Sequence, residues 1–296
     1  MKQSYLNNEK VFEEIQKGWS SDRKYYVETV NEEKLLLRVV SLEMYEHKKK
    51  EFAYMKALTS LGIPISQPLS FWREEDAVHM LFTWAEGHDA EHVLPQLDKE
   101  QQYHLGYEAG TILRKIHTLP ASGEIEEWEN VFNRKIDRNI RNYQACELKY
   151  ANGSAFLEYI EANRHLLKDR PQTFQHGDYH TGNMILSNEN KLTIIDFNRW
   201  SNGDPWEEFN RIDFTARVSP AFASGNIDGY FQGEPPELFF KLLALYSATN
   251  CLNALPWALD YSEKEVEIML NKGQAILESY DGMKKVIPSW YTGEFR

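Results

Sequence analysis

The stretch HGDYHTGNMILSNENKLTIIDF, residues 176–197, carries the densest set of chemically active side chains in the sequence. Two short apolar runs within it, MIL and LTII, flank the polar turn SNEN, which predicts a β-hairpin. The hairpin would bring Asn183, just before its first strand, close to Asp196, just after its second. Because Mg²⁺ prefers oxygen ligands and keeps several waters, these two side chains are sufficient protein ligands for it.

Asp178 lies on the loop five residues before Asn183, where its carboxylate can face an incoming hydroxyl and accept its proton. Gly177 and Gly182 allow loop conformations that other residues resist. Together with a metal pair, this arrangement indicates phosphoryl transfer from a metal-bound nucleotide. The spacing of His176, Asp178 and His180 also leaves open a transition-metal hydrolase, although that interpretation does not explain the hairpin or Asp196.

The pattern His-x-Asp-x-x-x-x-Asn, a hairpin and Ile-Asp-Phe resembles the catalytic and metal-binding segments of the aminoglycoside phosphotransferase and choline kinase-like family of small-molecule kinases. The resemblance implies a two-lobed protein-kinase-like fold. It also implies that Asp178 is the catalytic residue and that Asn183 and Asp196 hold the metal.

The sequence on either side of this stretch predicts an α+β fold with a small β-rich N-lobe and a larger α-rich C-lobe. The N-lobe would span residues 1–87, with a hinge at 83–87, and the C-lobe would span residues 88–296. The N-lobe shows one helical spacing and four strand-like runs, at residues 43–61, 24–30, 34–40, 69–72 and 77–84. Most of the remaining sequence has helical periodicity, including a capping-box pattern at Asp98 and Gln101.

Within the N-lobe, Leu36-Leu37-Arg38-Val39 resembles the family's third strand, and the resemblance implies nucleotide-binding residues on this strand and on both sides of it in sequence. Arg38 would contact the phosphates in the position where many kinases have Lys, and Glu51 would hold it by an ion pair. A phosphate-covering loop would lie around Ser20 and Ser21, with Lys24 adding charge. The backbone at the hinge, that of Thr83 and Ala85, would meet the purine.

The acceptor would bind beyond Asp178, against the C-terminal helices, and we selected Glu208, Asp213 and Trp257 as candidate contacts. Carboxylates with an aromatic wall suit a cationic acceptor. Each of these side chains has a simpler interpretation, because acidic residues commonly solvate a surface and Trp commonly packs in a core. His117, which ends a helix, is expected to be structural, and Asp204 is expected to brace its loop.

The net charge, the cysteines and the longest apolar run limit which partners and which cellular setting the sequence suits. The 296 residues carry a net charge of −12, which argues against nucleic acid and anionic membranes as partners. The two cysteines, Cys146 and Cys251, lack metal-type spacing and suit a reduced cytoplasmic protein. The apolar run 238–255 is interrupted by polar residues and predicts a buried core helix. We expect a monomer or a weak dimer.

The sequence therefore predicts a phosphotransferase that uses ATP or GTP with Mg²⁺ and acts on a small hydroxyl-bearing molecule. An aminoglycoside-like acceptor, and with it a role in antibiotic resistance, is the first expectation. The family also includes kinases of choline, methylthioribose, homoserine and macrolides, and fold alone does not choose among them. A nucleotide-binding pseudokinase is a further alternative, which the presence of Asp178, Asn183 and Asp196 opposes.

Overall fold

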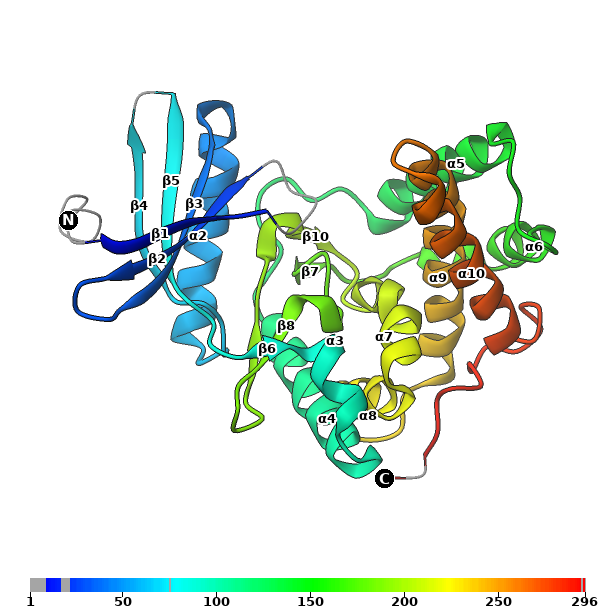
Figure 1. The fold of residues 1–296 in the computed structure, drawn as a ribbon. Coiled ribbons are helices and arrows are strands. Elements are labelled where there is room, and N and C mark those ends of the chain that lie inside the picture. Colours follow the sequence, from blue (N-terminus) through cyan, green and yellow to red (C-terminus); the bar gives the residue numbers. More distant parts are fainter. Residues whose placement is uncertain (1–8, 17–21, 75, 294, 296) are drawn as a thin grey trace. The chain divides into compact units, whose positions relative to one another are not determined.

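The computed structural model describes residues 9–16, 22–74, 76–293 and 295 (Figure 1). The chain forms two compact units, one made of Met1–Ala90 and Asn183–Trp200 and the other of Glu91–Gly182 and Ser201–Arg296. The segment with the predicted hairpin thus groups with the N-terminal strands rather than with the C-terminal helices that surround it in sequence.

The N-terminal unit is built on a five-stranded antiparallel sheet with the order β1-β2-β3-β5-β4. Its strands are β1 (Glu9–Ile15), β2 (Arg23–Thr29), β3 (Lys34–Ser41), β4 (Pro68–Glu74) and β5 (Ala77–Thr83). Strand β3 is central and apolar on both faces except at Arg38, as its sequence predicted. Strand β1 was not located from the sequence, because EKVFEEI has charged residues at four of its seven positions, a composition typical of a solvated segment.

Helix α2 (Tyr45–Ser60) packs against this sheet through the apolar residues Phe52, Met55 and Leu58. Gly62 follows the helix with a φ of 67°, a left-handed conformation that favours glycine, so it ends the helix as predicted. A second small sheet of this unit has the order β6-β8-β9, with strands at His88–Asp89, Met184–Leu186 and Leu192–Ile194. The last two form the predicted hairpin, paired antiparallel with Met184 opposite Ile194.

The C-terminal unit is mainly helical, and the α+β class is therefore confirmed. Its helices are α3 (Ala90–Val93), α4 (Lys99–Ile116), α5 (Trp128–Ala145), α6 (Ser154–Asn163), α7 (Ile212–Val218), α8 (Pro220–Phe231), α9 (Glu237–Leu259) and α10 (Glu263–Ser279). Two short strands, β7 (Thr173–Gln175) and β10 (Ser201–Gly203), pair antiparallel. Helix α4 begins with the predicted capping box, in which Asp98 accepts from the Gln101 N–H and Gln101 accepts from the Asp98 N–H.

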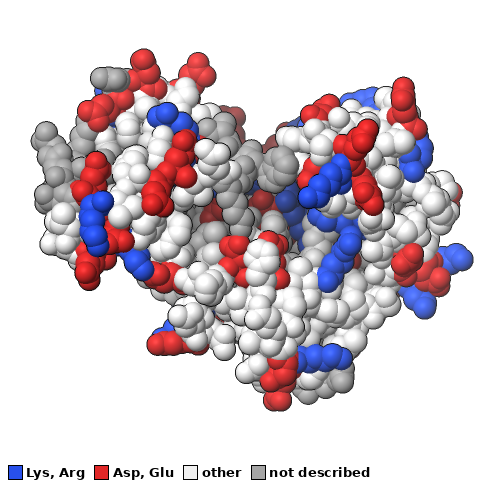
Figure 2. Space-filling model, in the orientation of Figure 1, with Lys and Arg blue, Asp and Glu red and all other residues white. Residues whose placement is uncertain are grey.

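Helix α9 forms the centre of the main apolar cluster of this unit, together with residues of α5, α6 and α10. Among the described residues it is the one helix long and apolar enough to cross a membrane by length and composition alone, but 72% of its most apolar window is buried inside the structure. The core helix predicted at 238–255 is confirmed. On the face shown in Figure 2, acidic and basic side chains are interspersed over both units.

Helices α4 and α8 cross at very short range through glycines. A Cβ atom added to Gly106 or Gly110 would lie 2.0 Å from a backbone oxygen of α8, that of Phe222 or Asn226. Glycines of α8 meet the α4 backbone in the same way, since a Cβ on Gly229 would lie 2.0 Å from the oxygen of Tyr107. The two backbones therefore touch with no side chain between them.

Candidate active site

The hairpin brings the two predicted metal ligands to one end of the β8–β9 pair. The N–H of Ile195 donates to the carbonyl of Asn183 at 3.0 Å, so Asn183 and Asp196 lie on adjacent chain ends. Asp196 has a left-handed backbone, with a φ of 62° and a ψ of 60°, which is uncommon for a residue with a side chain. Such strain is typical of functional positions. An amide and a carboxylate oxygen at one point fit the hard oxygen ligands that Mg²⁺ requires.

Lys24 of β2 lies beside this hairpin end. Its Nζ is 3.2 Å from Oδ2 of Asp196, and their side chains are 15% and 29% exposed. On the sheet, Lys24 pairs with Arg38 of the neighbouring strand. Two of the predicted nucleotide-binding cations are therefore cross-strand neighbours, and one of them contacts the predicted metal ligand directly.

Arg38 and Glu51 also come together as predicted: Nη1 of Arg38 donates to Oε1 of Glu51 at 2.6 Å. Arg38 further donates to the carboxylate of Asp22 and, at 3.0 Å, to Oδ1 of Asn198. Its side chain is 6% exposed. Burial opposes the charged form, but the carboxylates of Glu51, Asp22 and Asp196 outweigh it and raise the pKa of Arg38. Arg38 thus holds several elements of its unit together in addition to carrying charge.

Lys48 completes this cluster, and sequence reasoning missed it. Its Nζ donates to Asp22 and Glu51, each at 3.0 Å, and also to Asn198, and its side chain is only 1% exposed. Burial opposes ionisation of Asp22, but the charges of Arg38 and Lys48 keep its pKa below the ordinary value. Lys48 stands first in a run of three lysines, Lys48 to Lys50, which is typical of a solvated face. Its position four residues before Phe52 is the signal that could have placed it on the buried face of α2.

The other predicted nucleotide contacts are the side chains of Ser20 and Ser21 and the hinge backbone of Thr83 and Ala85. Ser20 and Ser21 lie outside the described residues. The N–H of Thr83 donates to the carbonyl of Gln67 at 3.0 Å, so this donor already has a partner. Ala85 lies beyond the end of β5 and is half-buried, and among the described residues its N–H makes no backbone hydrogen bond. Of the two predicted hinge contacts, Ala85 retains a donor for a purine edge.

The backbone of the loop that carries Asp178 is hydrogen-bonded to a buried carboxylate. Glu208 accepts hydrogen bonds from the N–H of His176 at 2.6 Å and from that of Gly177 at 2.9 Å. Gly177 has a φ of 83°, where glycine is needed. Nε2 of His117 lies 3.7 Å from Oε2 of Glu208, beyond hydrogen-bond distance, and its Nδ1 lies 3.0 Å from the Tyr230 hydroxyl. Glu208 therefore holds the backbone that presents Asp178 through its two hydrogen bonds.

Two basic side chains face the carboxylate of Asp178. Arg211 forms an ion pair with Oδ1 of Asp178, and Nε2 of His180 lies 3.4 Å from the same oxygen. Nδ1 of His180 accepts from the Gly182 N–H at 3.1 Å, and Nδ1 of His176 accepts from the Asp178 N–H at 3.2 Å. Each histidine thus uses one ring nitrogen to shape the loop. Arg211 was not predicted from the sequence.

The three predicted acceptor contacts have partners inside their unit. Glu208 holds the loop backbone and is 3% exposed. Asp213 is 4% exposed and accepts from Ser247 Oγ at 2.6 Å and from Trp290 Nε1 at 2.8 Å; burial raises its pKa. Trp257 is half-buried, with its ring 4.4 Å from that of Tyr261. The two carboxylates face inward, where they brace the protein.

Asp204 is likewise buried and braces its loop. It accepts from Arg170 at 2.7 and 2.9 Å, from Tyr246 Oη at 2.6 Å and from the Trp206 N–H at 2.9 Å. These contacts join the segment after β10 to α9.

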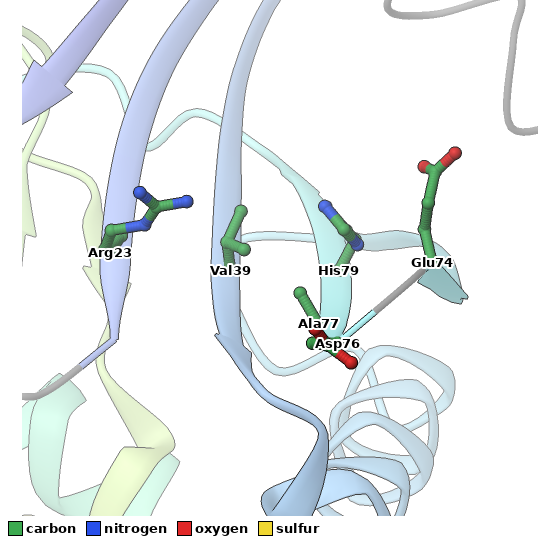
Figure 3. Close-up of a pocket in the computed structure, with 6 residues that line it drawn as sticks. All are labelled: Arg23, Val39, Glu74, Asp76, Ala77 and His79. Atoms are coloured by element: carbon green, nitrogen blue, oxygen red, sulfur yellow. The ribbon is translucent and has the colours of Figure 1, made fainter.

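A cavity of about 370 Å³ lies on the N-terminal sheet (Figure 3). It is lined by Arg23, Val39, Glu74, Asp76, Ala77 and His79. Because successive residues of a strand point to opposite faces, Val39 and its neighbour Arg38 lie on opposite faces of β3. This cavity is therefore separate from the Arg38 cluster.

The phosphotransferase enzyme family model matches residues 11–240 of the chain. No curated protein matches the chain significantly. Among solved structures, a choline/ethanolamine kinase family protein from Mesorhizobium loti is 14% identical with a TM-score of 0.66, covering 96% of this chain and 92% of that one. A thermostable mutant of aminoglycoside phosphotransferase APH(4)-Ia, in a ternary complex with ADP and hygromycin B, is 16% identical with a TM-score of 0.65, covering 93% and 96%.

The amicoumacin kinase hAmiN, in complex with AMP-PNP, Ca²⁺ and Ami, is 12% identical with a TM-score of 0.65, covering 93% of this chain and 90% of that one. At such identities these likenesses establish the fold and leave the substrate open. The predicted kinase-like α+β fold is confirmed. Since the family model covers most of the sequence, the chain belongs to the phosphotransferase enzyme family.

Proposed function

We propose that this protein is a nucleotide-dependent kinase that transfers the γ-phosphoryl group to a hydroxyl of a small molecule. Membership of the phosphotransferase family supports the reaction class. Two structural neighbours are complexes with ADP and with AMP-PNP, which supports use of a nucleotide. The neighbour with AMP-PNP also contains Ca²⁺, which supports a divalent cation in the reaction. In the cell we propose Mg²⁺ in that role and a cytoplasmic location.

In this proposal the residues of each unit have separate roles. Asn183 and Asp196 hold the metal, which neutralises charge on the phosphates. Lys24 and Arg38 supply further positive charge on the same unit. Asp178 orients the acceptor hydroxyl and accepts its proton as the new bond to phosphorus forms. The bond between the γ-phosphorus and the bridging oxygen of the nucleotide breaks, and the nucleoside diphosphate leaves.

The observation that carries the proposal is the way the Asp178 loop is held. Two backbone N–H groups of the loop, those of His176 and Gly177, bind the buried carboxylate of Glu208. A loop that only connects two elements does not need a buried carboxylate beneath it, because surface turns satisfy their N–H groups with water. Precise placement of Asp178 is what a proton acceptor in phosphoryl transfer requires.

The substitution Asp178→Asn tests this role. Turnover should fall by roughly 10²–10⁴-fold, because a positioned base contributes a factor of this size. Nucleotide affinity should stay within about twofold, since Asp178 is not placed among the nucleotide-binding residues. The measurement is coupled release of nucleoside diphosphate with a panel of hydroxyl acceptors, beside calorimetric binding of AMP-PNP.

Asp169→Asn is the matched control. Asp169 is exposed and has a φ of 56°, a conformation that Asn adopts readily, so its replacement should change neither measurement. Equal turnover in Asp178→Asn and the wild type would contradict the proposed mechanism. Nucleotide binding with no turnover on any acceptor would favour the pseudokinase, and stoichiometric Zn or Fe in the purified protein would favour the hydrolase.

The nature of the acceptor is the finer part of the proposal. The sequence favoured an aminoglycoside-like cation, and two structural neighbours are complexes with hygromycin B and gentamicin. In this chain, however, the buried carboxylates of Glu208 and Asp213 have partners within the protein. Aminoglycosides should therefore be assayed beside acceptors of other charge, including choline, homoserine, methylthioribose and macrolides.

A further inference from the structure

Three basic side chains gather next to Asp178 on the C-terminal unit, and we call Arg211, Arg217 and Lys272 the basic cluster. Arg211 directly precedes helix α7, and Phe214 and Arg217 follow it at intervals of three residues. Residues three apart on a helix are neighbours on its surface. Lys272 reaches this surface from α10, because its Nζ lies 4.3 Å from the centre of the Phe214 ring.

Two carboxylates lie beside the cluster, and both have partners. Arg211 forms its ion pair with Asp178, and the buried Asp213, whose pKa is raised by burial, accepts from Ser247 and Trp290. Within the described ranges of the chain, neither the exposed Arg217 nor the half-buried Lys272 has a carboxylate oxygen within 4.0 Å. Figure 2, in the orientation of Figure 1, shows Lys and Arg side chains close together over the region that α7 and α10 occupy.

The ionisation of Lys272 shows that these charges act on one another. Burial lowers the pKa of Lys272, and the positive charge of Arg217 and then that of Arg211 lower it further. The carboxylate of Glu265, whose effect is larger than that of Arg211, and the carboxylate of Glu91 act in the opposite direction without reversing the shift. Like charges brought together at reduced exposure cost free energy unless an anion joins them.

Space for such an anion lies between the same two helices. A cavity of about 110 Å³ is lined by Arg217 and Asp213 of α7, Ser279 of α10 and Trp290. This is the volume of roughly three or four water molecules in the liquid, enough for a carboxylate or phosphate group. The guanidinium of Arg217 provides hydrogen-bond donors there, whereas the Ser279 hydroxyl already donates to the Ala275 carbonyl at 2.8 Å.

We propose that the basic cluster binds an oxyanion of the acceptor, so that the substrate is a small hydroxyl compound carrying a carboxylate or a phosphate. Arg217 and Lys272 contact the anionic group, and Arg211 lies between this group and the hydroxyl at Asp178. The proposal rests on the proposed function, since it names the acceptor of that reaction. It replaces the expectation of a cationic acceptor, which three neighbouring cations would repel.

Binding can be tested without turnover. The full-length protein is saturated with AMP-PNP and Mg²⁺ and titrated at constant ionic strength with four hydroxyl compounds that differ in charge. These compounds are glycolate, glycerol 3-phosphate, glycerol and ethanolamine. We expect saturable binding of one or both anions and at least tenfold weaker binding of glycerol and ethanolamine, because paired charges in a partly desolvated site contribute strongly.

The variants Lys272→Met and Arg217→Met should each weaken anion binding by about tenfold. Lys272→Arg, which keeps the charge, should stay within about threefold of the wild type. Lys264→Met is the matched control, because Lys264 lies on the same helix but is exposed, and its loss should change nothing. Unaltered AMP-PNP affinity in each variant shows that the protein is folded.

Binding of neither anion by the wild type would overturn the proposal, as would binding that Lys272→Met and Arg217→Met leave unchanged. The affinities for glycolate and glycerol 3-phosphate show whether the site prefers a carboxylate or a phosphate. Because AMP-PNP is not turned over, a loss of anion binding is separate from a failure of phosphoryl transfer, which the Asp178→Asn assay detects. When the same turnover assay is applied to Lys272→Met, kcat/KM for anionic acceptors should fall relative to kcat/KM for neutral acceptors.

Discussion

Lys48, Lys49 and Lys50 are consecutive in sequence, yet only Lys48 is buried. Its ammonium group joins Asp22 and Glu51, which also bind Arg38, so two cations and two carboxylates balance one another inside the N-terminal unit. A buried network of this kind adds little over well-packed apolar residues, but removing one member leaves charge uncompensated. The cost of losing Lys48 should therefore be large.

We predict that Lys48→Met lowers the free energy of unfolding by roughly 3 kcal/mol, because it removes one of the two cations that contact Asp22 and Glu51 in the described part of the chain. Urea unfolding followed by circular dichroism measures this. Lys50→Met is the control, since Lys50 is exposed on the same helix, and it should change stability by less than about 0.5 kcal/mol. Similar losses in the two variants would show that the buried cluster does not stabilise the unit.

Among the elements, the crossing of α4 and α8 supports the loop that carries Asp178. Tyr179, next to Asp178, donates from its hydroxyl to the carbonyl of Ala109 in α4 at 2.7 Å. The C-terminal end of α4 carries His117, whose Nδ1 lies 3.0 Å from the hydroxyl of Tyr230 in α8. The separation of these two helices therefore determines where the supports of the loop lie.

Gly110→Ala should separate the two helices. Alanine favours a helix over glycine by about 1 kcal/mol, but its Cβ would lie 2.0 Å from the carbonyl oxygen of Asn226, and overpacking costs about 1–3 kcal/mol or more. We expect a net loss of about 2 kcal/mol in stability, measured by urea unfolding, and reduced turnover. Gly233→Ala, where a Cβ would meet no atom within 4 Å, should be neutral. A Gly110→Ala protein as stable as the wild type would contradict the close crossing.

In the whole molecule, the residues with proposed roles in the reaction are divided between the two compact units. Asn183, Asp196, Lys24 and Arg38 belong to the N-terminal unit, whereas Asp178 belongs to the C-terminal unit. Nucleotide binding should therefore depend on the first set and not on Asp178. A ligand that binds only the folded state stabilises it, by about 2.7 kcal/mol at one hundred times its Kd.

We predict that AMP-PNP with Mg²⁺ raises the thermal midpoint of the wild type and of Asp178→Asn, and raises that of Asp196→Asn much less. The reason is that Asp196→Asn removes the charged ligand of the metal. Differential scanning fluorimetry measures the shift, and EDTA should reduce it in the wild type by withdrawing the metal. An equal, EDTA-insensitive shift in all three proteins would refute the assignment of Asp196.

Elements whose signals are local could be predicted from the sequence alone. Alternation and turn residues located β2, β3 and the β8–β9 hairpin, and residues 98 and 101 located the start of α4. The order of Asp178, Asn183 and Asp196 was sufficient for the reaction class, because those residues lie on one continuous segment. Such signals need only neighbours a few residues away, so no tertiary information was required.

The contacts between charged side chains, by contrast, depend on the folded arrangement of distant segments and could not be predicted from the sequence. Lys48 contacts Asp22 across 26 residues and Asn198 across 150, and no local pattern contains such pairs. In the same way, Glu208 faces inward and binds the backbone of the Asp178 loop, and Arg211 pairs with Asp178. The physical reason is that an ion pair depends on distance and burial in space, whereas sequence periodicity reports only which face of one element is apolar.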